Sequence, residues 1–322
     1  MLNKIDAEIL HELLQNGRTS FAEIAKKLNI SKKTVWQHYL IMKQKGVIIG
    51  STLQLNYKKI GYNNVVNIFG SLENRNLKQA IDQIQKIPKI YSVFPNDPER
   101  NLGICALLKD ITELDRLRNQ LRHEFNLQKI KTFSWLAIKN FPENLLLHPN
   151  QKRSFLKIQT TNRKNENSKV ENLDSIDRKI IKILSSNSRI SINALSKKIK
   201  ASQYTISKKY KNLIQKNIIK SVIQINPKIL GYKAFPIFDL AFSSQVVIKN
   251  IIDYLVNIPD IIHLIMTTGD FELIVYAFVR NIEQFLEIKE KIVNMKDLMD
   301  MKIVIHNILP VWPTPNQYIS TI

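Results

Sequence analysis

Residues 16–35 read NGRTSFAEIAKKLNISKKTV, and residues 187–206 read NSRISINALSKKIKASQYTI. A shift of 171 residues superposes identical residues of the two stretches: Asn16 on Asn187, Arg18 on Arg189, Ser20 on Ser191, Lys26-Lys27 on Lys197-Lys198, Ser31 on Ser202 and Thr34 on Thr205. The likeness continues outward to Ile5-Asp6 on Ile176-Asp177 and, after one deletion, to Gly61-Tyr62 on Gly231-Tyr232. The chain is therefore a tandem duplication.

Within each copy, the first 60 residues predict three short helices, because apolar residues recur at three- and four-residue spacing. In the first copy these residues are Ile5, Ile9, Leu10, Leu13 and Leu14, then Phe21, Ile24, Ala25 and Leu28, then Val35, Tyr39 and Met42. Ser20 and Glu23 stand at capping-box spacing for the second helix, and Ser31 and Ser202 suit the N-caps of the third. Only two residues separate the second helix from the third, so the pair should cross sharply, as in a helix-turn-helix.

The β-branched residues after the third helix predict a short hairpin over residues 48–55 in the first copy and 219–225 in the second. Three helices with such a hairpin form a winged helix-turn-helix, which is too small to be an obvious enzyme. Its third helix has the size that fits a DNA major groove.

The second part of each copy alternates strand-like and helix-like runs in the order βαββαβ. The runs are 65–72, 77–87, 90–94, 102–108, 111–125 and 130–138 in the first copy, and 235–242, 246–258, 261–266, 271–279, 282–293 and 301–309 in the second. This order predicts an α+β, ferredoxin-like domain with helices on one face of an antiparallel sheet. The face of the sheet opposite the helices must be covered by another part of the protein or by a partner.

These patterns divide the chain into six parts. They are winged helix-turn-helix domain 1 (1–60), ferredoxin-like effector and oligomerisation domain 1 (61–140), a linker (141–172), winged helix-turn-helix domain 2 (173–231), ferredoxin-like domain 2 (232–310) and a tail (311–322). The linker is assigned because it is rich in Asn, Lys, Gln, Ser and Thr, with a polar run at 160–169.

Basic residues are concentrated in the two helical segments. The chain has 48 Lys and Arg against 27 Asp and Glu, a formal net charge of +21. Residues 1–60 carry +6 and residues 173–231 carry +11, whereas residues 232–322 carry −3. A uniformly basic composition would not leave the last segment acidic, so the pattern indicates a polyanionic partner, nucleic acid or an anionic membrane surface, at the helical segments.

The remaining composition predicts a soluble cytoplasmic protein without a metal or cofactor. The single Cys105 excludes a disulfide framework and fits a reducing compartment. No apolar run approaches the roughly 18 residues that span a bilayer, and residues 1–6 lack the pattern of a signal peptide. His263 and His306 lie on predicted strands without a second ligand at metal spacing.

In these features the sequence resembles the Lrp/AsnC (feast/famine) transcriptional regulators. The likeness is carried by Leu2-x-x-Ile-Asp6-x-x-Ile-Leu10 with Asn-Gly-Arg18, Leu173-x-x-Ile-Asp177 with Asn-Ser-Arg189, Ser31-x-x-Thr34-Val35 with Lys-Gly46-Val-Ile, and Thr-Gly269-Asp270-Phe-Glu272-Leu. The resemblance implies a sequence-specific regulator that binds double-stranded DNA, is not an enzyme, and can respond to an amino acid or a related small effector.

Two departures from the family pattern matter. The usual member has one copy per chain and assembles through its sheet domains, whereas this chain carries two copies, could form an internal pseudo-dimer, and could also form a homodimer through its sheet domains. The first copy has residues 95–100 (PNDPER) in place of the Thr-Gly-Asp turn. The family's effector pocket is therefore expected in the second copy or in neither.

In a helix-turn-helix, the N-terminal residues of the recognition helix meet base edges, while flanking basic groups hold phosphates. The residues predicted to meet bases are Lys32, Lys33, Trp36 and Gln37 in the first copy and Gln203, Tyr204, Ser207 and Lys208 in the second. Eight residues are predicted to contact phosphates or to contribute to the positive electrostatic field: Arg18, Arg189, Lys26, Lys27, Lys197, Lys198, Lys43 and Lys211. Trp36 and Tyr204 could instead pack within their domains. Because the two helices differ, we predict different half-sites and an imperfect or asymmetric DNA repeat.

By the same resemblance, Thr268, Gly269 and Asp270 border the effector pocket, where an acidic side chain near exposed amides could hold both ends of a zwitterion. The alternative is a purely structural turn, in which Gly269 adopts a positive φ and Asp270 bonds its own turn.

Two other functions remain open at this point. Some proteins that resemble this family are sirohaem decarboxylases of haem biosynthesis, whose site needs clustered arginines and a proton-transferring His or Tyr. The only dense group of that kind is Arg116, Arg118, Arg122 and His123, which equally resembles a solvated helix face. An architectural, sequence-indifferent DNA binder would share the basic charge but would not prefer one site.

Overall fold

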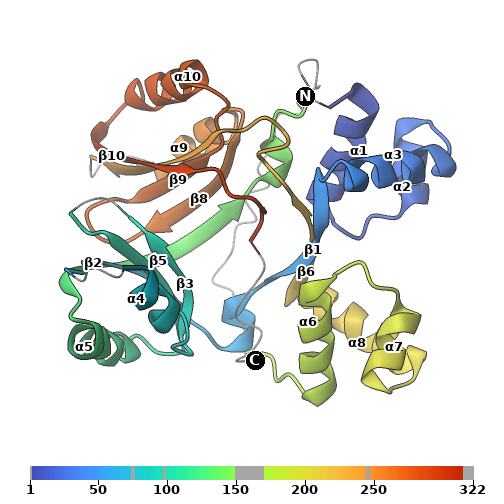
Figure 1. Ribbon diagram of the computed structural model, residues 1–322, viewed down its shortest axis with the longest axis horizontal. Helices are drawn as coiled ribbons and strands as arrows, with labels where there is room; N and C mark the ends of the chain where they lie inside the picture. The colour runs from blue at the N-terminus through green and yellow to red at the C-terminus, as the bar shows by residue number, and fades with distance from the viewer. Residues whose placement is uncertain (1, 74–76, 97–98, 149–169, 244–246, 315–322) are drawn as a thin grey trace.

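A computed structural model describes residues 2–73, 77–96, 99–148, 170–243 and 247–314, and Figure 1 shows how they are arranged. Each copy begins with a three-helix head. Head 1 consists of α1 (Lys4–Gln15), α2 (Phe21–Leu28) and α3 (Lys32–Gln44), and head 2 of α6 (Ser175–Ser186), α7 (Ile192–Ile199) and α8 (Gln203–Gln215). The predicted α+β fold class, with winged helix-turn-helix and ferredoxin-like parts, is confirmed.

The predicted caps define where the helices of the heads begin. Ser20 Oγ accepts the Glu23 amide at 3.1 Å, and the Glu23 carboxylate accepts the Ser20 amide at 2.9 Å, so α2 starts in a capping box. Ser31 and Ser202 accept the amides of Thr34 and Thr205, each at 3.0 Å. The recognition helices α3 and α8 therefore start at matched positions in the two copies.

Each copy then forms a sheet domain. Sheet domain 1 consists of β2 (Asn64–Ser71), α4 (Leu77–Ile84), β3 (Ile90–Pro95), β4 (Leu102–Leu108), α5 (Glu113–Phe125) and β5 (Gln128–Asn140). Sheet domain 2 consists of β7 (Ala234–Phe242), α9 (Ile248–Leu255), β8 (Ile261–Thr267), β9 (Leu273–Ala277), α10 (Ile282–Val293) and β10 (Leu298–Asn307). Both follow the predicted βαββαβ order.

The two sheet domains share one eight-stranded sheet, in the order β10-β7-β9-β8-β5-β2-β4-β3. The long strand β5 makes this possible: its first half pairs with β2, and its second half, from Trp135 to Asn140, pairs with β8 of the other copy. The copies are therefore joined where β5 pairs with β8, and this boundary is called the seam. β10 and β3 are the two ends of the sheet (Figure 1).

The strands that follow the heads do not form the predicted hairpins. β1 (Ile48–Leu55) pairs in antiparallel register with β6 (Ile219–Ile225) of the other copy, with Thr52 opposite Val222. The prediction of a hairpin in each copy was wrong, because the short helix η1 (Tyr57–Ile60) carries the chain onward to β2 instead of back along β1. The result is a ribbon between the heads, which ties one to the other.

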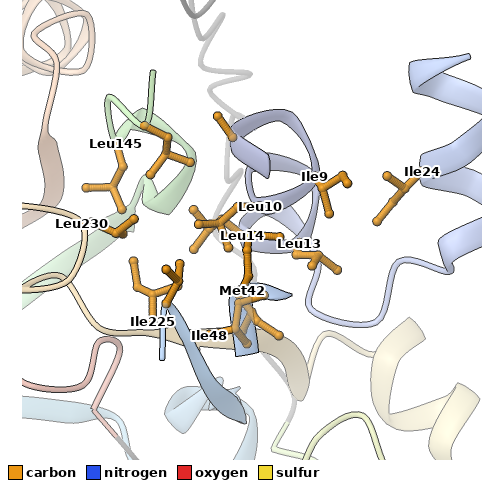
Figure 2. Packing of buried hydrophobic residues seen from close by; sticks show 14 of the residues in the cluster. Ile9, Leu10, Leu13, Leu14, Ile24, Met42, Ile48, Leu145, Ile225 and Leu230 are labelled. Carbon is orange, nitrogen blue, oxygen red and sulfur yellow. The ribbon is translucent and has the colours of Figure 1, made fainter. Parts of the chain in front are cut away.

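Each head is also anchored to the opposite copy. Figure 2 shows the core of head 1, where Leu10 and Leu14 of α1 pack in one cluster with Leu145, Ile225 and Leu230. The same cluster includes buried residues of the second copy: Tyr232, Ile262 and Phe278. The core of head 2 takes in Leu53 and Leu55 of β1, and Tyr57 and Ile60 pack against it. The orientation of each head is thus set by the other copy.

Parts of the expected linker and tail belong to the fold. Phe141, Leu145 and Leu147 are buried, around the short helix η2 (Pro142–Asn144), so residues 141–148 are not a free linker. The polar run 160–169 lies outside the described residues. In the expected tail, the backbone of Trp312 pairs with that of Ile225 at 2.8 and 2.9 Å. Among the described helices, none has the length and apolarity needed to cross a membrane.

Candidate nucleic-acid interface

The first turns of both recognition helices are open to solvent. Their apolar faces are buried through Val35 and Met42 in α3 and through Ile206 and Leu213 in α8. Ser207 is half-buried, and the other seven residues predicted to meet bases are exposed: Lys32, Lys33, Trp36, Gln37, Gln203, Tyr204 and Lys208. Trp36 is 49% exposed and Tyr204 is 77% exposed, so neither packs inside its head.

Basic side chains flank these first turns on both heads. The lysines predicted to contact phosphate are all exposed: Lys26, Lys27, Lys43, Lys197, Lys198 and Lys211. Lys27 also pairs with Glu12 of α1 at 2.5 Å, so its charge is partly compensated. Lys26 and Lys197 match at the end of the second helix, where Lys198 also lies, whereas Lys43 and Lys211 lie at unmatched positions in the second half of the two recognition helices.

Arg18 and Arg189 occupy equivalent positions and clasp the two heads together. Arg18 Nη2 donates to the carbonyl of Ile190 at 2.8 Å, and its guanidinium lies 4.7 Å from the ring centroid of Tyr210 in α8. Arg189 donates to the carbonyl of Gly17, and its guanidinium lies 5.5 Å from the ring centroid of Tyr39 in α3. Each arginine therefore contacts the recognition helix of the opposite head. These two reciprocal contacts, Arg18 with Tyr210 and Arg189 with Tyr39, are called the clasp.

The prediction that Arg18 and Arg189 contact phosphate does not fit this geometry, because both guanidinium groups are engaged between the heads. Burial lowers the pKa of Arg189 and raises the pKa of Tyr39, as expected for groups packed together away from water. The partners that the structure gives the two arginines lie in the other copy. The signal available in the sequence was the repetition of Asn-x-Arg at the same place in both copies.

Sequence reasoning also missed the close approach that lets the clasp form. The Gly17 amide donates to the carbonyl of Ser221 in β6 at 3.0 Å. A Cβ on Gly17 would lie 2.7 Å from the backbone carbon of Val222, so a side chain there would push the loop away from the ribbon. The equivalent Ser188 is fully buried and donates its amide to Ser51 of β1 at 3.3 Å.

Within each head, an aspartate ties the first helix to the recognition helix. Asp6 Oδ1 lies 2.7 Å from His38 Nδ1 of α3. At the matched position in the second copy, Asp177 lies 3.2 Å from Lys209 of α8. Lys209 also pairs with Asp174, and this bond lowers the pKa of Asp174 to about 2. The Ile-Asp motif of each copy therefore orients its recognition helix.

A family of winged helix-turn-helix DNA-binding domains matches residues 2–49 and again residues 173–220. The HTH-type transcriptional regulator Ptr1 of Methanocaldococcus jannaschii is 32% identical over 117 residues, which cover 36% of this chain and 78% of Ptr1. The chain belongs to the Lrp/AsnC family of HTH-type transcriptional regulators.

A second Lrp/AsnC relative is similar over a shorter stretch. The HTH-type transcriptional regulator LrpA of Pyrococcus horikoshii is 43% identical over 70 residues, 22% of this chain and 49% of LrpA. Among solved structures, the sirohaem decarboxylase NirDL matches with a TM-score of 0.62 and 12% identity, covering 94% of this chain and 90% of that chain. At that identity the match shows the shared fold, including the arrangement of the two copies.

The turn at Thr268, Gly269 and Asp270, which was predicted to border an effector pocket, lies at the seam between the copies. Thr268 and Ser134 of β5 exchange bonds: the Thr268 amide donates to the Ser134 carbonyl at 3.0 Å, and Thr268 Oγ1 accepts the Ser134 amide at 3.2 Å. Gly269 has a φ of +109°, as expected for a glycine turn, and a Cβ there would lie 2.7 Å from the Phe133 ring. Asp270 pairs with Lys131 across the seam rather than with its own turn.

The arginine group considered for a decarboxylase does not converge on a site. Arg116, Arg122 and His123 are exposed, and Arg118 is half-buried, along α5 on the helical side of sheet domain 1. In the described residues, the His, Cys, Asp and Glu side chains form no group of three or more suited to a metal ion. His263 bonds the Asn140 side chain at the seam, and His306 lies on β10.

Proposed function

We propose that this regulator binds one composite DNA site through two unlike recognition helices, each of which reads its own half-site. The observation that carries the proposal is the clasp: α3 and α8 are both exposed at their first turns, yet each is held by an arginine of the opposite head. The two recognition helices are therefore presented to DNA at one fixed separation. A duplex must match both helices and the distance between them.

The charge distribution supports DNA as the partner. The segments that contain the heads carry +6 and +11, whereas the segment that contains sheet domain 2 carries −3. Phosphate contacts from such a surface supply affinity that falls as salt rises. We propose that the exposed lysines at the ends of α2 and α7 supply these contacts. The buried free thiol of Cys105 suits a reducing cytoplasm, where we place the protein.

The chemistry of the two first turns supports unlike half-sites. α3 presents Lys32 and Lys33, which can donate to the acceptors of guanine. α8 presents Gln203, whose amide can pair with adenine through two hydrogen bonds, beside the exposed ring of Tyr204. We infer that head 1 favours a guanine-containing half-site and head 2 an adenine-containing one.

Selection from random duplexes tests this proposal. We expect the purified chain to select one motif with two different halves, and to prefer it over random duplex by roughly a thousandfold. A transplanted variant, Gln203→Lys, Tyr204→Lys, Ser207→Trp and Lys208→Gln, gives head 2 the residues of head 1 and should select two like halves. Identical halves for the natural chain, or an unchanged motif for the variant, would contradict the proposal. A preference near unity would indicate an architectural binder.

We further propose that a small zwitterion, such as an amino acid, acts at the seam turn. Lys131 and Asp270 are 37% and 55% exposed, and they offer one cationic and one anionic group side by side. A zwitterion could replace their mutual pair with two pairs of its own and change how the copies meet, and with them the heads. Asp270→Asn should abolish any amino-acid effect on DNA affinity, because it removes the carboxylate that would pair with the zwitterion's amine and already breaks the pair with Lys131. An effect that survives Asp270→Asn would place the effector elsewhere.

A further inference from the structure

The two ends of the eight-stranded sheet differ in how their outer edges are finished. An outer strand presents a row of backbone groups that can pair with another chain, and proteins commonly block such rows. β3 ends the sheet in sheet domain 1, and β10 ends it in sheet domain 2 (Figure 1). In the part of the chain that the structure describes, one of these edges is closed by the chain itself, and the other is open.

The edge of β3 is closed by a side chain. Gln85, just after α4, accepts the outward amide of Val93 at 2.9 Å and donates to the outward carbonyl of Tyr91 at 3.5 Å. Pro95, at the end of the strand, has no amide to offer. The matched position in the second copy is Val256, and there the corresponding strand, β8, pairs with β5 instead. Gln85 thus takes the place of a partner strand.

The edge of β10 is open. Ala234 of β7 bonds Val279, which follows β9, so the alternate residues of β7 point their backbone groups at β10. By the β7–β10 register, the backbone groups that point outward belong to Met301, Ile303, Ile305 and Asn307. The Met301 amide donates to the carboxylate of Asp300 at 2.7 Å. Within the described ranges, no group pairs with the outward edge from Ile303 to Asn307.

An apolar helix flank lies beside this open edge. Ile282, Leu286 and Val293 of α10 are 60%, 50% and 48% exposed. At about 100° per residue they fall within about 40° of one another and on the side of the helix opposite Lys291. The Lys291 carbonyl accepts the hydroxyl of Tyr254 from α9. The apolar flank therefore lies on the side of α10 away from this contact with α9. Figure 1 shows α10 connected directly to β10 at that end of the sheet.

Two of the three flank residues are apolar only in the second copy. The buried residues of α5 and α10 align with a shift of 171 residues, Leu117 on Ile288 and Leu121 on Ile292. With that shift, Leu286 falls on Asp115 and Val293 falls on Arg122. Ile282 falls on Ile111, which is also exposed, so the flank is partly apolar in both copies, and only the Leu286 and Val293 part is charged in the copy whose sheet edge is closed.

We propose that the β10 edge and the outer flank of α10 bind the same surface of a second copy of this chain. The two β10 strands pair in antiparallel register about Ile305, which makes the two sheets continuous, and the two α10 flanks then lie on the same side of the joined sheet. The alternative of β10 against β3 of the second copy, which would repeat the seam within the chain, is blocked by Gln85 and Pro95. A contact between like edges closes after two chains, whereas unlike edges would add chains without end.

The mass of the full-length chain in solution tests the proposal, and the measurement needs no DNA. We expect twice the chain mass of 37.5 kDa. Ile305→Lys puts a charge on the open edge, and Leu286→Asp gives α10 the residue found on α5. Each should weaken self-association at least about tenfold. Ile111→Lys, at an exposed site of sheet domain 1, is the matched control and should change nothing.

Two further measurements separate edge pairing from other contacts. The amides of Ile303, Ile305 and Asn307 should gain protection from hydrogen exchange as protein concentration rises. Gln85→Val, which copies the residue of the second copy, should open the β3 edge and yield assemblies larger than two chains. A single-chain mass at every concentration would overturn the proposal, as would a two-chain mass that neither Ile305→Lys nor Leu286→Asp reduces, or amides that stay unprotected.

Discussion

Arg18 of head 1 stacks on Tyr210 of the recognition helix of head 2, with 4.7 Å between the guanidinium and the ring centroid. The reciprocal contact joins Arg189 of head 2 to Tyr39 of the recognition helix of head 1. Duplication placed the same Arg and the same Tyr in each copy, and the fold uses them across the copies rather than within them. The separation of the two recognition helices is therefore set by the clasp and by the ribbon of β1 and β6.

Loss of the clasp should affect composite sites more than half-sites. Replacing both Arg18 and Arg189 by Ala removes three ring contacts, one on Tyr210 and two on Phe21 and Tyr39, each of about 0.5–2 kcal/mol, and the carbonyl bonds beside them. We expect affinity for the composite site to fall about tenfold or more, with little change for a duplex that carries one half-site. Titrations of both duplexes measure this.

The double variant Lys43→Ala and Lys211→Ala is the matched control, because these lysines are exposed on the recognition helices. It should weaken binding to both duplexes alike and lower the salt dependence. If the arginine variant behaves in the same way, Arg18 and Arg189 contact phosphate and the clasp does not position the helices.

The residues proposed to contact bases should each act on one half-site only. Gln203→Ala should relax the preference for adenine at one position of the second half-site, by about 1–3 kcal/mol, and leave the first half-site unchanged. Lys32→Ala should do the reverse. Competition between single-base variants of the selected site measures both effects, and equal loss at every position would show that these residues make only phosphate contacts.

The seam turn should resist a side chain at Gly269. Gly269→Ala must adopt a positive φ and must also displace the Phe133 ring, whereas Gly231→Ala meets only the positive φ, with no atom within 4 Å. A left-handed non-glycine residue costs about 1–3 kcal/mol. We expect both variants to lower the free energy of unfolding, and Gly269→Ala to lower it more. Equal losses in denaturant titrations would mean that Phe133 yields freely.

Acid should loosen the seam through His263. This residue of β8 bonds Asn140 of β5 and contacts the Tyr276 ring, and burial lowers the pKa of His263 to about 4. The unfolded histidine titrates near 6.5, so on acidification the unfolded chain binds the proton first. The stabilisation is complete above pH 6.5 and is lost as the pH falls to about 4.

We expect this loss to reach about 3 kcal/mol at most. His263→Gln keeps a polar partner for Asn140 but has no proton to gain in this range, so its unfolding free energy should be flatter between pH 6.5 and 4. An identical pH profile for the variant and the natural chain would rule out His263 as the titrating group.

The helical heads could be predicted from sequence because their determinants are local. Helix periodicity, the Ser20–Glu23 box and the caps at Ser31 and Ser202 all act within a few residues, and the exposed first turns follow from them. The ribbon could not be predicted in the same way. The partner of Ile48–Leu55 is about half a chain away, and a strand pattern alone does not name its partner.

The prediction of a linker at residues 141–148 and the prediction of phosphate contacts by Arg18 and Arg189 departed from the structure for related reasons. Leu145 and Leu147 stand in a polar segment, and only the tertiary structure brings α1 against them. Arg18 and Arg189 lie in a basic surface, where a phosphate contact is the simplest interpretation, because their ring partners belong to the other head. In both places, tertiary contacts that the local sequence does not specify determine what the residues do.

The most direct test of the central claim is DNA affinity measured while the spacing between the two selected half-sites is changed one base pair at a time. Two recognition helices held at a fixed separation predict one sharp optimum, a further weaker one about a helical turn away, and affinity close to that of a single half-site elsewhere. Affinity that stays constant across the series would contradict the claim.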